Sequence, residues 1–356
     1  MTKIINVNPE NVNEDILQSS DEIKLAGDII RNGGLVAFPT ETVYGLGGNA
    51  LFADSSMKIY AAKGRPSDNP LIVHISEIDE VYDVAEEVSD KAGQLMEKYW
   101  PGPLTLIFKK KAVVPKETTG GLDTVAVRLP NHSIARALIK AAGVPIAAPS
   151  ANTSGRPSPT RAEHVIEDLS GKIDAIIDGG SVGIGLESTI VDMTEEVPTL
   201  LRPGFYTKKM IEDVVGVCKA DPVVFAKEKP VDVKPKAPGM KYRHYAPKGQ
   251  LTIVYGNKDR VISKINELII GHKENNEKVL VIATAETKDC YLCDNVLCVG
   301  ERSRKGDIAS HLFGVLREAD DLGAEYIYSE SFENDSLGEA IMNRLSKAAG
   351  YNYIEV

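Results

Sequence analysis

The chain has 356 residues, of which 43% are hydrophobic and 26% are charged. This balance is ordinary for a globular protein and excludes a largely disordered chain, and the length favours two domains. The net charge of -10 argues against broad, sequence-independent nucleic-acid binding, although it allows a local basic pocket for one anionic ligand. No apolar run reaches transmembrane length, and residues 1–13 lack the features of a signal peptide. A cytoplasmic location is therefore the default expectation.

The amino-terminal part of the chain is predicted to contain both helices and strands. Apolar residues at near-helical spacing predict a helix over 20–32, which Gly33 and Gly34 would end. A second helix, over about 54–62, should end at Gly64, and a third should cover 133–142. Apolar runs predict strands at 35–38, 71–75, 104–108, 124–129, 144–148, 175–177 and 188–192. Because several strands follow one another without a helix between them, the sheet should be mixed.

The most informative stretch is 144–160, V-P-I-A-A-P-S-A-N-T-S-G-R-P-S-P-T. Its apolar run should end at Pro149, which cannot donate to a sheet ladder. The loop that follows is dense in hydroxyls and amides, and Thr160-x-x-Glu163 has the form of a capping box, so a helix is expected to begin there. The free N–H groups of a helix N-terminus favour an anion. Most loops of this composition are ordinary solvated turns, so this interpretation depends on the other motifs.

Three cations stand in positions that suggest chemistry. Lys63 and Arg65 follow a predicted helix, where basic residues also favour the helix dipole without any further role. Pro66 and Pro70 suggest a rigid, exposed presentation that suits stabilisation of phosphate charge. Arg128 lies in an otherwise apolar strand and, if buried, needs an anionic partner, either a structural carboxylate or a substrate carboxylate.

Several familiar catalytic patterns are absent. Gly45-x-Gly47-x-x-Ala50 fits the dinucleotide fingerprint formally, but residues 39–44 separate these glycines from the strand, so we reject it as a nicotinamide or flavin site. The sequence has no P-loop, no G-x-S-x-G motif and no carboxylates spaced for a two-metal centre. The remaining inventory of cations, hydroxyls and amides suits transfer at a phosphate better than acyl hydrolysis.

The spacing of the four cysteines does not predict a metal site. Cys290, Cys293 and Cys298 form C-x2-C-x4-C, but a structural zinc needs a fourth ligand, for which His311 is the only nearby candidate. Cys298 lies in an apolar run and is expected to pack as a small hydrophobic residue. We therefore predict no metal site and no redox role.

The carboxy-terminal part begins with a segment rich in lysine and proline, 227–238, as expected of an extended linker. Residues 238–247 have the sequence P-G-M-K-Y-R-H-Y-A-P, which contains more aromatic and basic residues than a simple flexible linker needs. Beyond it, strands are predicted at 251–255, 278–283, 296–299 and 326–328, and helices at about 258–270, 307–322 and 338–349. This alternation predicts a small doubly wound α/β domain.

Taken together, the motifs resemble the YrdC-type threonylcarbamoyl-AMP synthases, in their long two-domain form. The matching pieces occur in the family's order and cover residues 20–205 almost continuously. They are F-P-T-E-T-V-Y-G-L-G, K-G-R-P-S-D-N-P-L-I-V-H, W-P-G-P-L-T, L-D-T-V-A-V-R-L-P, P-I-A-A-P-S-A-N-x-S-G-x-P-S-P-T, D-G-G…G-x-E-S-T-I and L-R-P-G. The resemblance implies a YrdC-like catalytic domain over 14–215 with a twisted mixed sheet, an interdomain linker or lid over 216–249, and a small Rossmann-like domain over 250–356.

The resemblance also implies a reaction and a set of site residues. The reaction is the synthesis of L-threonylcarbamoyl-AMP from L-threonine, bicarbonate or CO2, and ATP with release of pyrophosphate, the first step of tRNA threonylcarbamoyladenosine modification. The implied catalytic residues are Lys63, Arg65, Ser150 and Asn152. The residues implied for L-threonine are Thr40, His74, Arg128, Ser150 and Ser188. Those implied for ATP are Arg65, Asn69, Thr124, Ala148, Asn152, Ser158, Arg202 and His244.

Partners and alternatives follow from the same resemblance. Mg2+ is expected with the substrate ATP, and a tRNA threonylcarbamoyl transferase complex is expected to use the product. We expect no membrane association and no stable direct binding of tRNA. The competing hypothesis is a nucleotide- or RNA-binding regulatory module without catalysis. A third hypothesis is carbamoyl transfer onto another protein, the activity of a relative that joins a YrdC-type domain to acylphosphatase and zinc-finger modules. This sequence lacks those modules.

Overall fold

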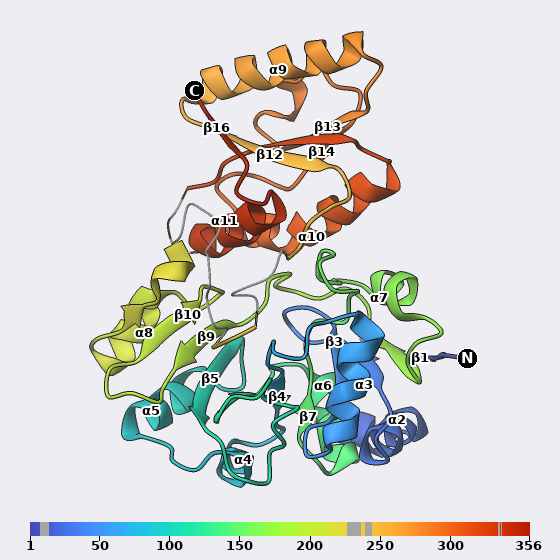
Figure 1. The fold of residues 1–356 in the computed structure, drawn as a ribbon, viewed down its shortest axis with the longest axis vertical. Helices are drawn as coiled ribbons and strands as arrows, with labels where there is room; N and C mark the ends of the chain where they lie inside the picture. Colours follow the sequence, from blue (N-terminus) through green and yellow to red (C-terminus); the bar gives the residue numbers. More distant parts are fainter. Residues whose placement is uncertain (8–13, 226–235, 239–243, 334, 336) are drawn as a thin grey trace. The chain divides into compact units, whose positions relative to one another are not determined.

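The computed structural model describes residues 1–7, 14–225, 236–238, 244–333, 335 and 337–356. These residues form two compact units (Figure 1). The first unit takes in mainly Met1–Ser154 and Ser158–Val224, and the second takes in Gly155–Pro157 and the described residues from 244 to 356. The division expected from the sequence, at 14–215, 216–249 and 250–356, stays a prediction. Residues 226–235 and 239–243 of the expected linker lie outside the described residues.

The first unit is built on one twisted sheet with both parallel and antiparallel neighbours, which confirms the predicted mixed sheet. Its strand order is β1-β8-β2-β3-β7-β4-β6-β5-β9-β10-β11. The strands are β1 (Lys3–Asn6), β2 (Val36–Phe38), β3 (Gly45–Asn49), β4 (Ile72–His74), β5 (Leu104–Lys109), β6 (Thr124–Arg128), β7 (Ile146–Ala147), β8 (Ala175–Asp178), β9 (Thr189–Asp192), β10 (Thr199–Arg202) and β11 (Lys219–Ala220). The long order brings together the ends of β4, β6, β5 and β9, which carry several predicted site residues.

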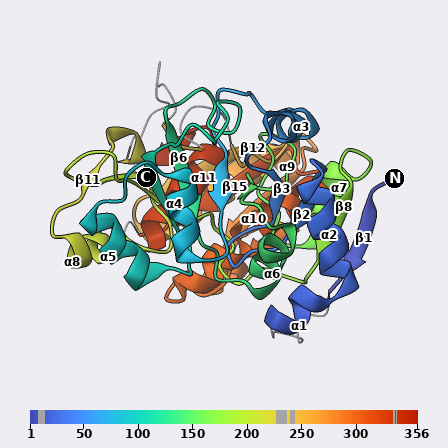
Figure 2. The same cartoon turned by 90° about the horizontal axis from the view of Figure 1, so that it is seen from below.

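Several helices of the first unit begin or end at residues that favour helix ends. The side chain of Ser20 accepts a hydrogen bond from the Ile23 N–H, and Gly64 and Gly143 end their helices in the left-handed conformation, which glycine adopts without strain. The helices are α1 (Glu14–Ser19), α2 (Asp21–Arg31), α3 (Ala53–Lys63), α4 (Val81–Val84), α5 (Asp90–Tyr99), α6 (Ser133–Ala142), α7 (Ala162–Leu169) and α8 (Lys208–Val215). Short 3-10 turns cover Ile78–Glu80 and Pro222–Phe225. In Figure 2, α1, α2 and α6 lie side by side, and these three helices contact one another.

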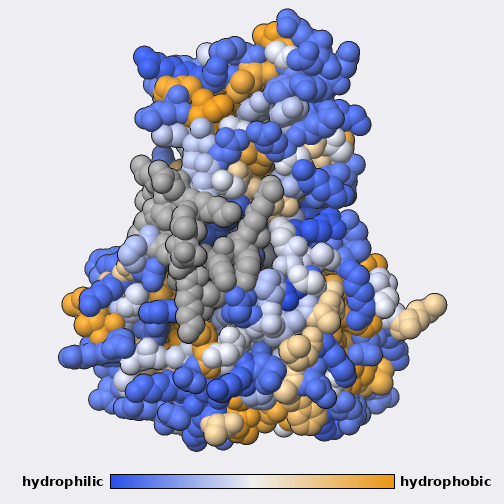
Figure 3. Space-filling model, in the orientation of Figure 1, coloured by the Kyte–Doolittle hydropathy of each residue, from blue (hydrophilic) through white to orange (hydrophobic). Residues whose placement is uncertain are grey.

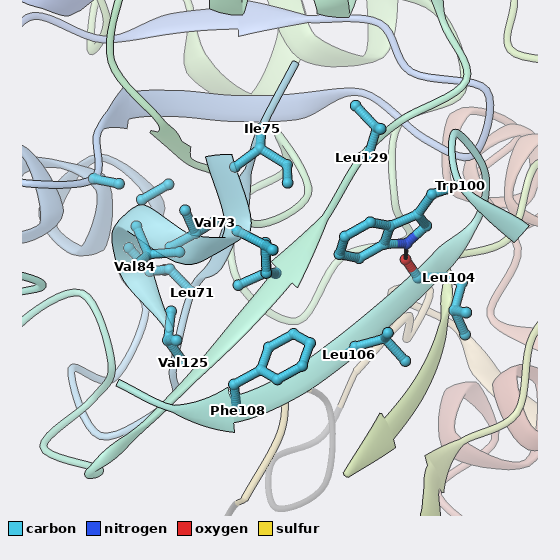
Figure 4. Close-up of a cluster of buried hydrophobic side chains, with 14 of the residues drawn as sticks. Leu71, Val73, Ile75, Val84, Trp100, Leu104, Leu106, Phe108, Val125 and Leu129 are labelled. Atoms are coloured by element: carbon cyan, nitrogen blue, oxygen red, sulfur yellow. Dashed lines mark hydrogen bonds between the residues drawn. The ribbon is translucent and has the colours of Figure 1, made fainter. Parts of the chain in front are cut away.

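The core of the first unit follows from the alternation of apolar residues along its strands. Leu104, Leu106 and Phe108 of β5 are buried and point to the same side of the strand, as residues two apart do (Figure 4). The buried indole of Trp100 lies beside them, and its Nε1 donates a hydrogen bond to the Leu104 carbonyl at 2.8 Å (Figure 4). This packing holds β5 rigidly against its neighbours β6 and β9.

Four strands of the first unit, β1, β3, β10 and β11, were not predicted. The glycine-rich segment Gly45–Asn49 forms β3, which pairs antiparallel with β2 and β7. A Cβ atom on Gly47 would lie 2.8 Å from side-chain atoms of both Ile146 and Phe38. Glycine is required there because the neighbouring side chains occupy the space that any other residue would need.

The predicted capping box at the start of α7 is wrong. The helix begins at Ala162, its N-cap is Arg161, and no side chain caps it. The Thr160 N–H instead donates to Nδ1 of His164, at 3.2 Å. With Thr160 as its N-cap the helix would begin at Arg161, so it begins one residue later than the sequence pattern indicates.

The second unit contains a five-stranded sheet in which every pair is parallel, in the order β14-β13-β15-β12-β16. Its strands are β12 (Gln250–Tyr255), β13 (Val279–Ala283), β14 (Val296–Cys298), β15 (Tyr326–Glu330) and β16 (Tyr353–Glu355). Figure 1 shows α9 (Lys258–Glu274) on one face and α10 (Lys305–Asp321) and α11 (Leu337–Ala348) on the other. A short 3-10 turn covers Lys288–Cys290. The predicted doubly wound α/β arrangement is confirmed, whereas β16 was not predicted.

Figure 3 shows hydrophilic residues over most of the visible surface, with hydrophobic ones in separate small groups. Within the part of the chain that the structure describes, no helix is both long and apolar enough to cross a membrane.

Candidate active site

The loop after β7 is held in place by main-chain hydrogen bonds to β3. The Leu46 N–H donates to the Pro149 carbonyl, and the Ala151 N–H donates to the Tyr44 carbonyl, both at 2.8 Å. Ser150 pairs with Gly45 in an isolated antiparallel bridge. The side chains of Ser150 and of the residues after it therefore have fixed positions, although they lie in a loop.

Lys63 is buried against this loop. It lies in the last turn of α3 and is 1% exposed. Its ammonium donates to the Ser150 carbonyl at 2.6 Å, to the Asn152 carbonyl, and to Oδ1 of Asn152 at 3.4 Å. The predicted exposed presentation of Lys63 is wrong. The three acceptors compensate the charge that burial would otherwise disfavour.

Ser150 and Asn152 form a cluster with Lys63, while Arg65 is held by different groups. The Ser150 hydroxyl donates to Oδ1 of Asn152 at 2.5 Å. The half-buried Arg65 donates from Nε to the Asn69 carbonyl at 3.2 Å and from Nη2 to the Pro70 carbonyl at 3.1 Å. The structure thus joins three of the four predicted catalytic residues directly.

Arg128 lies at the carboxyl end of β6, with its side chain 5% exposed. Its Nη1 donates to the Thr42 hydroxyl at 3.0 Å, and Nη2 lies 2.6 Å from Oε2 of Glu41. Thr42 is bonded in turn to the Thr40 hydroxyl at 2.9 Å, which donates to the Val43 carbonyl at 2.7 Å. The structure supplies the structural carboxylate that the sequence offered as one of two possible partners for this arginine.

The guanidinium of Arg128 keeps unused donors. The Nη2 contact with Glu41 is an ion pair without hydrogen-bond alignment, and Nε has no acceptor among the described residues. An arginine presents Nε and Nη2 as one edge that matches a carboxylate. Nη2 of this edge already faces Glu41, so Nε is the donor of the edge that has neither an acceptor nor an ion pair among the described residues.

His74 lies next to Arg128, because the two residues are register partners on β4 and β6. Burial and the nearby Arg128 charge lower the pKa of His74 to about 3, so the ring is neutral near neutral pH. Nδ1 lies 3.1 Å from the Ile72 carbonyl and donates to it, which leaves Nε2 as an acceptor in the neutral ring.

Ser188 and Arg202 are joined through buried contacts. Nη2 of Arg202 donates to the Ser188 hydroxyl at 3.0 Å, and Nε donates to the Ser188 carbonyl at 2.9 Å. The same hydroxyl is bonded to Thr105 at 2.7 Å. Thr105 is the register partner of Arg128 across β5 and β6, so it connects the surroundings of Ser188 with those of Arg128.

The remaining residues predicted for ATP lie at several places. The buried side-chain oxygen of Asn69 has no hydrogen-bond partner among the described residues, and the Ser158 hydroxyl donates to Glu187 at 2.6 Å. Thr124 begins β6, and Ala148 is buried directly after β7. His244 belongs to the second unit, where its ring centroid lies 5.5 Å from that of Tyr245. Its assignment stays a prediction.

Sequence reasoning missed three groups of this region: Glu41, Thr42 and Thr105. Glu41 and Thr42 belong to the quoted motif F-P-T-E-T, but nothing local indicates that they contact Arg128. Thr105 carries a weak signal, since it is one hydroxyl within the apolar strand L-T-L-I-F. Hydroxyls in a buried strand need a partner, which marks them as candidates for a polar cluster.

The cysteines take no part in a metal site that the structure describes. All four are free thiols, and no group of three or more histidine, cysteine or acidic side chains is placed to hold a metal ion in the described ranges. Cys298 is exposed, so the prediction that it packs as a hydrophobic residue is wrong. β14 is the outermost strand next to β13, and its edge position leaves the Cys298 side chain in solvent.

Comparisons with known proteins agree with this geometry. A family model described as "Telomere recombination" matches residues 28–204, and one described as "Threonylcarbamoyl-AMP synthase, C-terminal domain" matches residues 206–350. The threonylcarbamoyl-AMP synthase of Pyrococcus abyssi is 50% identical, with 100% of both chains covered. The chain belongs to the threonylcarbamoyl-AMP synthase family. The Bacillus subtilis member is 46% identical, with 96% of both chains covered.

A solved structure agrees with the family at the level of the fold. The crystal structure of P. abyssi Sua5 complexed with L-threonine superposes with a TM-score of 0.91, at 49% identity and with 100% of both chains covered. Membership of the threonylcarbamoyl-AMP synthase family makes the chain an enzyme rather than the regulatory module that was the competing hypothesis.

Proposed function

We propose that this chain synthesises L-threonylcarbamoyl-AMP from L-threonine, bicarbonate or CO2, and ATP, and releases pyrophosphate. The observation that carries the proposal is the buried Lys63 ammonium, held by Ser150 and Asn152 in a loop fixed to β3. A buried, preorganised cation suits a reaction in which negative charge develops on phosphate oxygens.

In this proposal Arg128 binds the carboxylate of L-threonine through its Nε and Nη2 edge, which has unused donors. The neutral His74 contributes an acceptor at Nε2 without adding a second positive charge. Hydroxyls of Thr40, Ser150 and Ser188 are the groups that would contact the threonine hydroxyl. These three hydroxyls lie on different segments of the first unit, so their common role stays a proposal.

The reaction proceeds in two steps. The unprotonated amine of L-threonine attacks the carbon of CO2, and loss of a proton from nitrogen leaves a carbamate. A carbamate oxygen then attacks the α-phosphorus of ATP in line, the bond between the α-phosphorus and the bridging oxygen breaks, and pyrophosphate leaves. Lys63 and Arg65 offset the charge that develops on the phosphate oxygens. The residues that we propose for ATP are Arg65, Asn69, Thr124, Ala148, Asn152, Ser158, Arg202 and His244.

Mg2+ is proposed as the companion of ATP and not as a resident ion. The described residues offer no cluster of ligands for a metal ion. Phosphate oxygens and water commonly supply most ligands of Mg2+ on a nucleotide. No step above is assigned to the metal.

The product is a mixed anhydride, which is reactive towards water, so a further enzyme must use it soon after release. We propose that a tRNA threonylcarbamoyl transferase complex does so and that the synthase does not hold tRNA stably. The cytoplasmic location expected from the sequence stays a prediction.

The deciding experiment measures pyrophosphate release from ATP and bicarbonate, with and without L-threonine, and detects the adenylate by mass spectrometry. Threonine-dependent release with the threonylcarbamoyl adenylate present is the expected result, and Lys63→Ala should abolish it while leaving the fold intact by circular dichroism. Lys264→Ala, which changes a lysine of α9 in the second unit, is the matched control and should remain active. Release without threonine would point to another acceptor, and no release would contradict the proposal.

A further inference from the structure

The second unit contains a cavity of about 310 Å³ that no step of the proposed reaction uses. It lies at the carboxyl edge of the parallel sheet, where β12 and β15 are neighbours in register. After β12 the chain enters α9 on one face of the sheet, and after β15 it enters α11 on the other face (Figure 1). Gly256 and Lys258, which follow β12, and Glu330 and Phe332, at and after the end of β15, line the cavity. A crevice where adjacent strands lead to opposite faces is the place where doubly wound folds bind ligands.

The walls of the cavity are held by a buried carboxylate. Glu330 is 3% exposed and accepts hydrogen bonds from the hydroxyls of Thr287 and Tyr291 and from the Arg302 guanidinium. The three donors follow different strands, Thr287 and Tyr291 after β13 and Arg302 after β14. Arg302 also donates to the Ser331 carbonyl at 3.0 Å. Because these contacts fix the loops in one arrangement, the cavity is formed before any ligand arrives.

Two cations, Arg302 and Lys258, and two carboxylates, Glu330 and Glu333, line the cavity. Both oxygens of Glu330 are occupied by the donors named above, while 33% of the Arg302 side chain stays exposed. Glu333 lies 3.3 Å from Lys305, a residue outside the lining that is also paired with Asp335. Lys258 is exposed and has no ion-pair partner within the described ranges of the chain. Arg302 and Lys258 are therefore the lining side chains that carry the positive charge for an anionic ligand.

Apolar side chains line another part of the wall. Val261 and Ile262, in the first turns of α9, and Phe332 line the cavity together with the cations. The Arg302 guanidinium lies 5.6 Å from the centre of the Phe332 ring, which fixes its plane further. A rigid guanidinium next to an apolar wall matches a ligand with a carboxylate or phosphate on an apolar body.

We propose that this cavity binds a small organic anion, whose carboxylate or phosphate contacts Arg302 and Lys258 and whose apolar part packs against Val261, Ile262 and Phe332. None of the lining residues is among those proposed for the synthesis, so the cavity adds a ligand-binding role to the second unit. The simpler interpretation is that Glu330 only ties the loops together. The two interpretations differ in whether an anion binds and in which side chains its binding depends on.

The test uses the full chain and two probes, phenyl phosphate and benzoate, which carry the two candidate anionic groups on the same apolar ring. Binding is followed by saturation-transfer difference NMR and by isothermal titration calorimetry. Four variants separate the possible sites. Arg302→Gln and Lys258→Ala alter the cavity, Lys264→Ala alters a half-buried lysine on the same helix outside the lining, and Lys63→Ala alters the candidate active site.

At least one probe should bind, and the dissociation constant should rise about tenfold in Arg302→Gln, the usual loss when a charge-assisted hydrogen bond is removed. Lys258→Ala should weaken binding by a smaller factor, and Lys264→Ala and Lys63→Ala should leave it unchanged. The probe that binds more tightly tells whether the natural ligand carries a phosphate or a carboxylate. Because Lys258 is exposed, its variant keeps the test valid if Arg302→Gln fails to fold. Failure of both probes to bind, or binding that neither cavity variant alters, would overturn the proposal. Neither result bears on the threonine-dependent release of pyrophosphate.

Discussion

Two side chains of one segment contact the guanidinium of Arg128. Thr42 fixes Nη1 and Glu41 lies against Nη2, and both residues come from the segment directly after β2. A guanidinium is planar, so two fixed nitrogens determine where the third one points. Glu41 and Thr42 are thus positioning residues that hold the free edge of Arg128 in one direction.

This arrangement predicts a selective effect on L-threonine. Replacing Glu41 by Gln removes the negative partner of a buried guanidinium, so Arg128 should lose its fixed orientation. We expect KM for L-threonine to rise about tenfold, which corresponds to about 1.4 kcal/mol, with little change in KM for ATP. Steady-state kinetics with each substrate varied in turn would measure both constants.

The controls separate positioning from general damage. Glu41→Asp should restore part of the affinity, because it keeps the charge. Glu212→Gln, which removes a carboxylate paired with Lys208 on α8, should change neither constant. An equal rise in both KM values would contradict a role confined to the threonine carboxylate.

His74 gives a prediction about pH. Its pKa is lowered to about 3 in the folded protein, mainly by burial and secondly by Arg128, from an ordinary value of 6.5. The unfolded chain therefore binds a proton at a higher pH than the folded chain does, and folded stability falls as pH drops below about 6.5, by up to about 1.4 kcal/mol per pH unit. Urea unfolding between pH 7 and pH 5 should show a steeper loss for the wild type than for His74→Gln. Equal slopes would mean that His74 has the same pKa in the folded and the unfolded chain.

The sequence identifies the residues of the candidate active site, but it does not predict their burial or their hydrogen-bond partners. The motifs that carry Lys63, Ser150 and Asn152 are recognisable, and the structure brings these three side chains together. The burial of Lys63 was not predictable, because its acceptors are main-chain oxygens of a loop far along the sequence. The partners of Arg128 were missed for the same reason, since only the folded sheet brings the end of β2 next to β6.

Among the helices and strands, features that depend on neighbouring residues were easier to predict than features that depend on contacts far along the chain. The end of α3 at Gly64 was predicted, because a helix cap depends on neighbouring residues. The start of α7 was predicted wrongly, because a contact with His164 replaces the expected cap. β3 was missed because glycine rarely favours strands, and its glycines are required by side chains on β2 and β7.

The close packing of β3 predicts the effect of a single methyl group. Gly47→Ala would place a Cβ 2.8 Å from Ile146 and Phe38, both buried, so the strands must shift apart. We expect a loss of about 1–3 kcal/mol in the free energy of unfolding, the usual cost of overpacking a core. Gly93→Ala in α5 is the matched control, since no atom lies within 4 Å of the added methyl and alanine should stabilise this helix by about 0.5–1 kcal/mol. Equal stability of Gly47→Ala and the wild type in urea unfolding would show that the strands adapt freely.

At the scale of the whole molecule, the sequence predicts the fold class but not the strand order. The edge strand β1 was not predicted. It pairs with β8, which follows it by about 170 residues along the chain. Pairings of this kind depend on the sum of many weak contacts and leave no local pattern. The alternation of strands and helices in the second unit is a local pattern, so its doubly wound arrangement was predictable.

The net charge of the whole chain predicts how the synthase relates to tRNA. With 51 acidic against 41 basic residues, the molecule repels a polyanion at long range, and the buried Lys63 and Arg128 are not available to contact a backbone phosphate on the surface. We expect no saturable binding of unmodified tRNA at physiological ionic strength, measured by fluorescence anisotropy with labelled tRNA. ATP binding by the same sample would serve as the control for a folded protein. Saturable binding that weakens steeply with added salt would contradict the prediction, because such a dependence requires a basic surface that releases counterions from the tRNA backbone.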